Sequence, residues 1–269
     1  MTTDQPLRFE LEIELPGTPE QVWDAIATGP GISSWFLPSD VVEHLGGHVE
    51  FHMGPGASSE GEVTAWEPPQ RFGYAEPGWA ELTGRENTGQ TPMVSEFVVE
   101  AVSGGSCVLR VVTSAFGTGA DWEDEFFEEM GRYWRPSFYT LREYLTRFPG
   151  QHATVVERST TVEGVDPADL WTVLAARLGS TTAGDRVDVA GAAGSLHRWL
   201  APPDAMDALV VLDPPLRGMV TLVGIGGDGQ GIAVVRAHLF GETAATDAES
   251  WGERWQDWLD ALTADAAQR

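Results

Sequence analysis

The sequence predicts an α+β protein in which a long amphipathic helix closes over a curved antiparallel sheet, followed by a smaller domain of similar element order. Large apolar residues recur every three or four positions through 121–148, which draws one stripe along a helix of period 3.6. Burying such a stripe contributes about 10–20 kcal/mol, so the helix must lie across a large apolar surface. The stripe consists of Trp122, Phe126, Met130, Trp134, Phe138, Leu141 and Leu145.

The first elements are a strand and a capped helix. Apolar and polar residues alternate through 9–15, which is typical of a half-buried strand, and Pro16-Gly17 ends it. Thr18 can cap the following helix, Pro19 suits its first position, and Gln21 completes a capping box. A short apolar piece then occupies 32–37.

The region between this piece and the long helix contains strands joined by turns. Gly46-Gly47 and 103–106 have hairpin-turn chemistry, whereas the Gly- and Thr-rich segment 78–92 is predicted to be a mobile loop. Pro136 falls inside the long helix and should kink it or remove one backbone hydrogen bond. The predicted strands are 41–44, 48–53, 61–66, 71–75, 94–102 and 107–116.

The second half repeats this order in a shorter form. We expect a domain at 1–148, a linker, and a second domain at 153–269, with Asp166 capping its first helix. The repeat lacks counterparts of 32–37 and 78–92. Its predicted strands are 155–162, 186–190, 195–200, 208–212, 218–224 and 232–240. Matched points are Pro19 to Trp23 with Pro167 to Trp171, and Trp134, Phe138 and Leu141 with Trp251, Trp255 and Trp258.

Composition limits the classes of function. The net charge is −25, with 41 acidic residues against 16 basic ones, and lysine is absent. This charge argues against binding to nucleic acid or to an anionic membrane surface. The single cysteine, Cys107, excludes an internal disulfide. No secretory signal and no bilayer-spanning run is visible, so we expect a cytoplasmic protein, and the lysine-free composition suggests a GC-rich bacterial genome.

The first half contains a set of motifs that spans nearly its whole length. They are Thr18 to Ile26, Trp35-Phe36, Gly61-Glu62-Val63, Pro68 to Phe72, Phe116-Gly117 before Trp122, and Trp134 with Leu141 and Tyr144-Leu145. Each motif alone is weak. Together they resemble the START-like (SRPBCC) superfamily, and more narrowly the branch related to the activator of the heat-shock-protein-90 ATPase.

The resemblance implies a helix-grip fold, in which a bent antiparallel sheet wraps the long helix and leaves a cavity between them. Relatives bind lipids, polyketides, hormones or other hydrophobic molecules, some are cyclases or aromatases, and some are co-chaperones. Such a likeness indicates the fold far better than the activity. The second half departs from the family pattern, which leaves any pocket there in doubt.

A cavity in the first domain would be lined by one face of the long helix and the inner face of the sheet. The same residues could instead fill a solid core, which is the commoner use of such stripes. Polar groups near enough to orient a ligand are Tyr74, Tyr133, Arg132 and Arg135. The candidate lining residues are Trp35, Phe36, Phe51, Met53, Trp66, Tyr74, Phe97, Phe126, Met130 and Trp134.

Catalytic and metal-binding signals are weak. His48, Glu50 and His52 alternate along one strand, but their face should be solvated and no fourth ligand is evident, so we expect no zinc site. No nucleophile elbow, phosphate-binding loop or zinc motif occurs, and the glycine-rich 224–229 fits a hairpin turn. No buried acid–base pair is apparent, and no cofactor is implied.

These observations favour non-covalent binding of a small hydrophobic, lipid- or polyketide-like molecule in the first domain. Two alternatives stay open. The first is a co-chaperone-like interaction module that uses the acidic surface to bind a protein partner. The second is a polyketide cyclase-like enzyme, which would need an acidic or histidine side chain pointing into the cavity.

Overall fold

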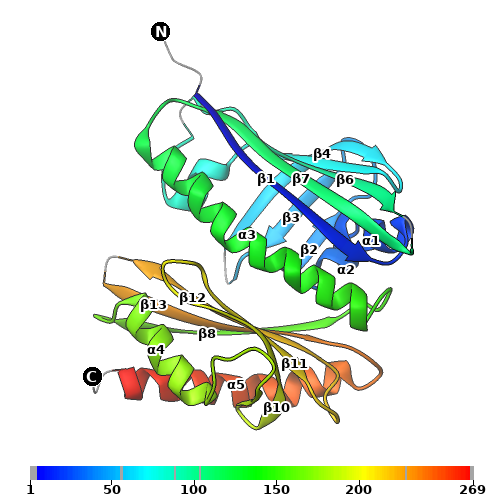
Figure 1. Ribbon diagram of the computed structural model, residues 1–269. Helices are drawn as coiled ribbons and strands as arrows, with labels where there is room; N and C mark the ends of the chain where they lie inside the picture. Colours follow the sequence, from blue (N-terminus) through cyan, green and yellow to red (C-terminus); the bar gives the residue numbers. More distant parts are fainter. Residues whose placement is uncertain (1–4, 55–56, 88, 103, 228, 267–269) are drawn as a thin grey trace. The chain divides into compact units, whose positions relative to one another are not determined.

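The computed structural model describes residues 5–54, 57–87, 89–102, 104–227 and 229–266 (Figure 1). The chain divides into two compact units, Met1–His152 and Ala153–Arg269. Both units consist of one antiparallel sheet together with helices that cover one of its faces.

The first unit contains a seven-stranded sheet in the order β1-β7-β6-β5-β4-β3-β2. The long helix α3 crosses one face of this sheet and packs along β1 (Figure 1). This arrangement confirms the helix-over-sheet fold class predicted from the sequence. The elements are β1 Gln5–Pro16, α1 Pro19–Ala27, α2 Gly29–Ile32, β2 Ser39–Val41, β3 His48–His52, β4 Ser58–Glu67, β5 Arg71–Glu76, the 3-10 helix η1 Trp79–Thr83, β6 Met93–Val102, β7 Ser106–Gly117 and α3 Asp121–Arg147.

The second unit repeats this topology with a six-stranded sheet in the order β8-β13-β12-β11-β10-β9. Its described residues contain no counterpart of α2, β2 or η1, as expected for a shortened copy. The similar element order confirms the predicted tandem. The elements are β8 Thr154–Glu163, α4 Pro167–Leu178, β9 Arg186–Val189, β10 Ala192–Leu200, β11 Met206–Leu212, β12 Gly218–Gly227, β13 Gln230–Leu239 and α5 Ala244–Ala266.

The helix starts follow the predicted capping chemistry. The Gln21 backbone N–H donates to Thr18 Oγ1 at 3.4 Å, and the Thr18 N–H donates to Gln21 Oε1 at 2.9 Å. Asp166 accepts from the Ala168 N–H at 2.8 Å. Because these bonds satisfy backbone donors that the first helical turn leaves unpaired, α1 and α4 begin where the sequence indicates.

The apolar stripe of α3 faces the sheet, and the helix continues past Pro136. Phe138 is buried beneath Trp35 and Phe97, with ring centroids 5.7 and 6.4 Å away. At Gly131 the helix comes so close to β1 that an added Cβ would lie 3.0 Å from the Phe9 ring. The helix therefore lies directly on the sheet along much of its length.

Part of the segment 78–92, predicted as a mobile loop, forms the short helix η1, and residue 88 lies outside the described residues. Trp79 opens η1, is fully buried, and donates its indole N–H to the Thr91 carbonyl at 2.9 Å. Its ring packs against Phe126 of α3, with centroids 5.3 Å apart. Gln90 donates to Glu123 Oε1 at 2.9 Å. The glycine-rich composition concealed this anchoring, because one tryptophan fixes the segment against the long helix.

A second difference concerns the strand predicted at 41–44. The pairing of β2 ends at Val41, and His44 donates its backbone N–H to the Val42 carbonyl at 2.8 Å. This short-range bond turns the chain before β3. The glycine-rich turn predicted at 224–229 lies between β12 and β13, where residue 228 falls outside the described residues.

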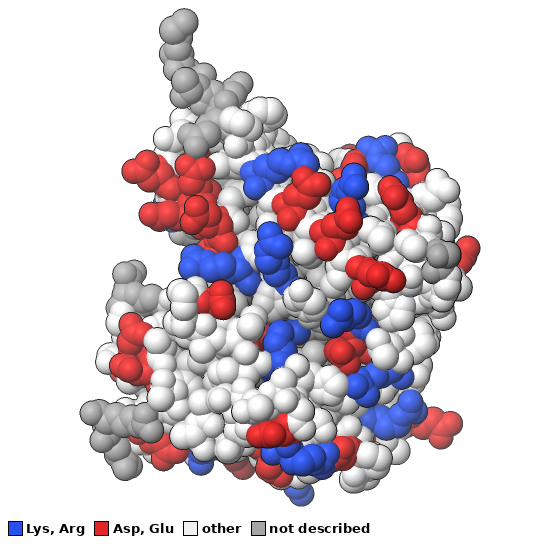
Figure 2. Space-filling model, in the orientation of Figure 1, with Lys and Arg blue, Asp and Glu red and all other residues white. Residues whose placement is uncertain are grey.

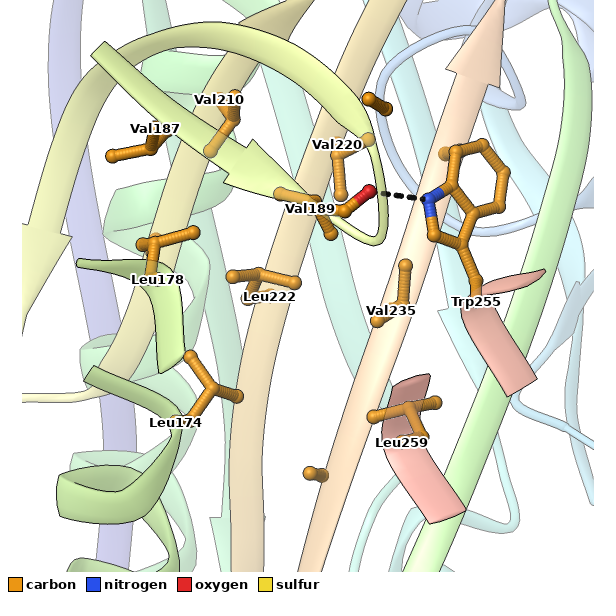
Figure 3. Close-up of a cluster of buried hydrophobic side chains, with 14 of the residues drawn as sticks. Leu174, Leu178, Val187, Val189, Val210, Val220, Leu222, Val235, Trp255 and Leu259 are labelled. Carbon is orange, nitrogen blue, oxygen red and sulfur yellow. Dashed lines mark hydrogen bonds between the residues drawn. The ribbon is translucent and has the colours of Figure 1, made fainter. Parts of the chain in front are cut away.

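The second unit has a continuous apolar core between its sheet and its helices (Figure 3). Trp255 of α5 is fully buried there and donates its indole N–H to the Val189 carbonyl at 3.3 Å. Leu259, Leu174 and Val235 lie around the same space (Figure 3). Large side chains thus occupy the space between helix and sheet in this unit.

Among the described residues, no helix is both long enough and apolar enough to cross a bilayer. The cytoplasmic location expected from the sequence stays a prediction.

We predict that Trp79→Ala lowers the free energy of unfolding of the first unit by about 3–5 kcal/mol, because it empties a fully buried aromatic site. Leu82→Ala is the matched control in the same short helix, where Leu82 is 38% exposed, and should lower it by about 1 kcal/mol or less. Urea-induced unfolding measures both. Equal small losses would show that η1 is not anchored by Trp79.

Candidate functional site

The first unit contains a cavity of about 300 Å³ between its sheet and the N-terminal half of α3. Side chains from β3, β4, β5, η1, β6 and α3 contribute to its wall, together with the segment after α2. The lining residues are Phe36, Leu37, Phe51, Met53, Ser59, Tyr74, Glu76, Leu82, Met93, Phe126, Glu129, Met130, Tyr133 and Trp134.

Aromatic rings form one wall of the cavity. Phe36 lies between Phe51 and Trp134, with centroid distances of 6.4 and 6.0 Å. Phe51 in turn packs against Tyr74 at 5.2 Å. Edge and tilted ring contacts of this kind hold the side chains in fixed orientations. The wall is therefore a preformed apolar surface.

Seven of the ten sequence-predicted lining residues meet at this cavity: Phe36, Phe51, Met53, Tyr74, Phe126, Met130 and Trp134. Trp35 and Phe97 instead line a smaller space of about 20 Å³ beneath the aromatic wall, which is large enough for about one water molecule. Trp35 is fixed there by donating its indole N–H to the Ala25 carbonyl at 2.8 Å.

Trp66 does not line the cavity, contrary to the expectation. It pairs with Phe72 across β4 and β5, beyond a register shift between Val63 and Ala65. Its ring packs against Trp23 of α1, with centroids 5.0 Å apart. Trp66 therefore shares the inner face of the sheet but belongs to the end covered by α1.

The sequence reasoning missed Glu76, the last residue of β5. Glu76 is only 4% exposed, lines the cavity, and accepts a hydrogen bond from the Ser59 hydroxyl. Residues two apart on a strand share a face, so Glu76 continues the inward row of Phe72 and Tyr74. That alternation was the available signal, but the predicted strand ended one residue before it.

Burial raises the pKa of the Glu76 carboxyl from its ordinary 4.5 to about 7, and the Ser59 hydrogen bond offsets part of this effect. Burial, together with the nearby Glu76 charge, also raises the pKa of Tyr74 well above 10. The cavity thus presents a neutral phenol and a carboxyl group that changes charge near neutral pH.

The four polar residues expected to orient a ligand fall into two groups. Tyr74 and Tyr133 line the cavity, whereas Arg132 and Arg135 are exposed and absent from its lining. The Arg135 guanidinium lies 5.3 Å from the centroid of the Phe9 ring, on β1. Glu129 at the edge of the cavity is a lining residue that the sequence did not single out.

A more polar hollow of about 830 Å³ adjoins the cavity and shares Met53, Ser59 and Leu82 with it. Met53 and Leu82 are 46% and 38% exposed, so this hollow forms an entrance. Its acidic side chains are Glu60 and Glu81.

Asp40, Glu50 and His52 form one group of possible metal ligands, with ligand atoms within 4.8 Å of one another. His52 Nε2 lies 2.8 Å from Asp40 Oδ2, and His48 Nε2 lies 3.9 Å from Glu50 Oε2. Asp40 comes from β2 and was not anticipated. These partly exposed groups contact one another at the surface of β2 and β3.

A family model described as "Polyketide cyclase / dehydrase and lipid transport" matches residues 6–148. The matched range contains every element that lines the cavity. The match confirms the resemblance to the START-like superfamily stated from the sequence. No curated protein matches the chain.

Three solved structures illustrate what this chain is similar to. Protein MLL2253 from Mesorhizobium loti has 20% identity and a TM-score of 0.45, over 52% of this chain and 98% of that chain. The Aha1 dimer from Colwellia psychrerythraea has 18% identity and a TM-score of 0.42, over 51% of this chain and 95% of that chain. The di-domain ARO/CYC BexL from the BE-7585A biosynthetic pathway has 13% identity and a TM-score of 0.43, over 97% of this chain and 95% of that chain.

The raised pKa of Glu76 predicts how stability depends on pH. Between pH 4.5 and about 7 the folded chain holds a proton that the unfolded chain has released, so the free energy of unfolding falls as pH rises through this window. Between pH 5 and 8, wild type should lose about 2–3 kcal/mol more than Glu76→Gln.

Urea unfolding at pH 5, 6, 7 and 8 measures this difference. Glu100→Gln changes an exposed carboxylate at the end of β6 and should follow the wild-type profile. Parallel profiles for wild type and Glu76→Gln would show that the Glu76 carboxyl titrates normally.

Proposed function

Because this chain belongs to the polyketide cyclase / dehydrase and lipid transport family, we propose that its first domain binds a small hydrophobic molecule between the sheet and α3. The observation that carries the proposal is the apolar, ring-walled cavity of about 300 Å³. Ligand sites have this character, with mostly apolar walls and a few polar groups that fix orientation.

The apolar wall of the cavity favours an apolar occupant. Because the cavity opens toward solvent, water contacts this wall when no ligand is bound, and covering it with an apolar molecule contributes about 25 cal/mol per Å² of apolar surface buried. Water fills cavities stably only where several polar groups hold it. Here the polar groups gather around Glu76 and Ser59, so an apolar molecule suits the remaining wall better than water.

In this function the affinity comes from burial of apolar ligand surface against Phe36, Phe51, Phe126, Met130 and Trp134. A polar group of the ligand would lie near Glu76, because this buried carboxyl gains most from a new hydrogen-bond partner. The entrance beside Met53 and Leu82 gives the path from solvent.

Glu76 also supports the cyclase-like alternative. A buried carboxyl group with a pKa of about 7 can both accept and donate a proton near neutral pH, which is what acid–base catalysis requires. The sequence showed no such group pointing into the cavity. Dehydration of a β-hydroxy ketone is a reaction that one such residue could assist. The carboxylate would take a proton from the carbon beside the carbonyl, the C=C bond would form as the β C–O bond breaks, and the carboxyl group would return the proton to the departing hydroxyl, which leaves as water.

We propose further that residues 153–269 are a shortened START-like domain that has lost the cavity. The buried Trp255, Leu259 and Leu262 of α5 support this, because they fill the space between helix and sheet. The co-chaperone-like module and its protein partner stay predictions.

Met130→Trp should weaken the binding of N-phenyl-1-naphthylamine, a neutral fluorescent probe of apolar cavities, by about ten-fold or more, because the larger side chain occupies the cavity. Tyr139→Trp, on the exposed face of the same helix, is the matched control and should bind like wild type. Fluorescence titration measures both. Equal affinity in all three proteins would place the binding site elsewhere.

For the cyclase-like alternative, wild type should convert 4-hydroxy-4-phenylbutan-2-one to the enone, followed by absorbance, at least about 100-fold faster than Glu76→Gln. Probe binding should be the same in both proteins, so that lost turnover reflects proton transfer and not a damaged cavity. Absence of turnover in wild type, with normal probe binding, would leave ligand binding as the function.

A further inference from the structure

Resting on the proposed function, we infer that the ligand of this cavity is a cation, with an apolar body and one protonated amine that pairs with Glu76. The inference concerns the chemical class of the ligand and depends on three features of the cavity: a buried carboxyl group without a basic neighbour, an acidic entrance, and aromatic rings beside both.

Glu76 is buried, and none of the ion pairs among the described residues includes it. Its described hydrogen-bond donor is the Ser59 hydroxyl, which is neutral. No arginine or histidine occurs among the described residues that line the cavity or its entrance. A buried carboxyl group in this setting has lost its hydration and gained one neutral donor, so an ammonium group would restore a partner of opposite charge.

Two arginines near this region contact aromatic rings. Arg135 lies over the Phe9 ring, and Arg85 lies 4.9 Å from the centroid of the Trp122 ring. Neither lines the cavity or the entrance. The described lining residues therefore include no basic partner for the carboxylate or phosphate of an anionic lipid.

The acidic side chains at the edge point to the same ligand charge. Glu129 lies on the cavity wall, and Glu60 and Glu81 lie at the entrance. Acidic side chains also gather over the N-terminal part of α3 (Figure 2). Such a distribution attracts cations into the entrance and repels anions.

The aromatic wall can bind the same group. Tyr74 lies two residues from Glu76 along β5, and its ring packs against Phe51 of β3. Phe36 and Trp134 continue the wall. Ring faces attract a cation within about 6 Å, and the attraction is stronger where water is excluded. A neutral ketone or alcohol would use the apolar wall but leave Glu76 without a charged partner.

The test compares three soluble molecules that differ only in one end group: 4-phenylbutylamine, 4-phenylbutan-1-ol and 4-phenylbutyrate. At pH 8, isothermal titration calorimetry should give the amine an affinity about ten-fold or more above that of the alcohol, with the carboxylate weakest. Glu76→Gln should abolish the preference for the amine over the alcohol. Glu100→Gln, an exposed change of the same net charge, should keep the full amine preference.

The inference is overturned if the alcohol or the carboxylate binds as tightly as the amine, or if Glu76→Gln keeps the preference. If the amine preference is absent while N-phenyl-1-naphthylamine still binds and Met130→Trp still blocks it, the cavity binds hydrophobic molecules but not cations. If neither the probe nor any of the three molecules binds, the proposed function fails together with the inference.

Discussion

The contact between the apolar stripe of α3 and the inner face of the sheet is the constraint on which the first domain depends. Where the helix lies closest, at Gly131 and Phe138, rings and backbone fill the interface. Toward its N-terminus the helix lies across the cavity from β3, β4 and β5, and Phe126 packs there against Trp79 of η1. The cavity is the space that this uneven packing leaves.

The second domain has a similar strand order but a different packing between its helix and its sheet. It has no counterpart of α2, β2 or η1 among its described residues, and its helix places fully buried Trp255 and Leu259 against the sheet (Figure 3). Of these elements, η1 contributes Leu82 to the cavity wall, and the segment between α2 and β2 contributes Phe36 and Leu37. These elements therefore distinguish the first domain, for which we propose a ligand site, from the second, for which we propose none.

Local patterns predicted most of the fold, because the helix stripe, the Thr18 and Asp166 caps and strand alternation act over a few residues. The cavity was less predictable. Trp66 lies on the inner face of the sheet, as expected, but beyond the end of the cavity along β4. Its position there follows a register shift between β4 and β5. Asp40 reaches His52 only through strand pairing. Glu76 was missed since a single acidic residue at a strand end usually faces solvent, and only the burial around it shows otherwise.

The methionines offer the most direct test of where a ligand binds. Met53, Met93 and Met130 line the cavity, whereas Met206 and Met219 belong to the second domain. In spectra of protein labelled with ¹³C at the methionine methyl groups, N-phenyl-1-naphthylamine should shift the first three signals and leave the other two unchanged. Shifts confined to Met206 and Met219, or no shift at saturating probe, would contradict a ligand site between the sheet and α3.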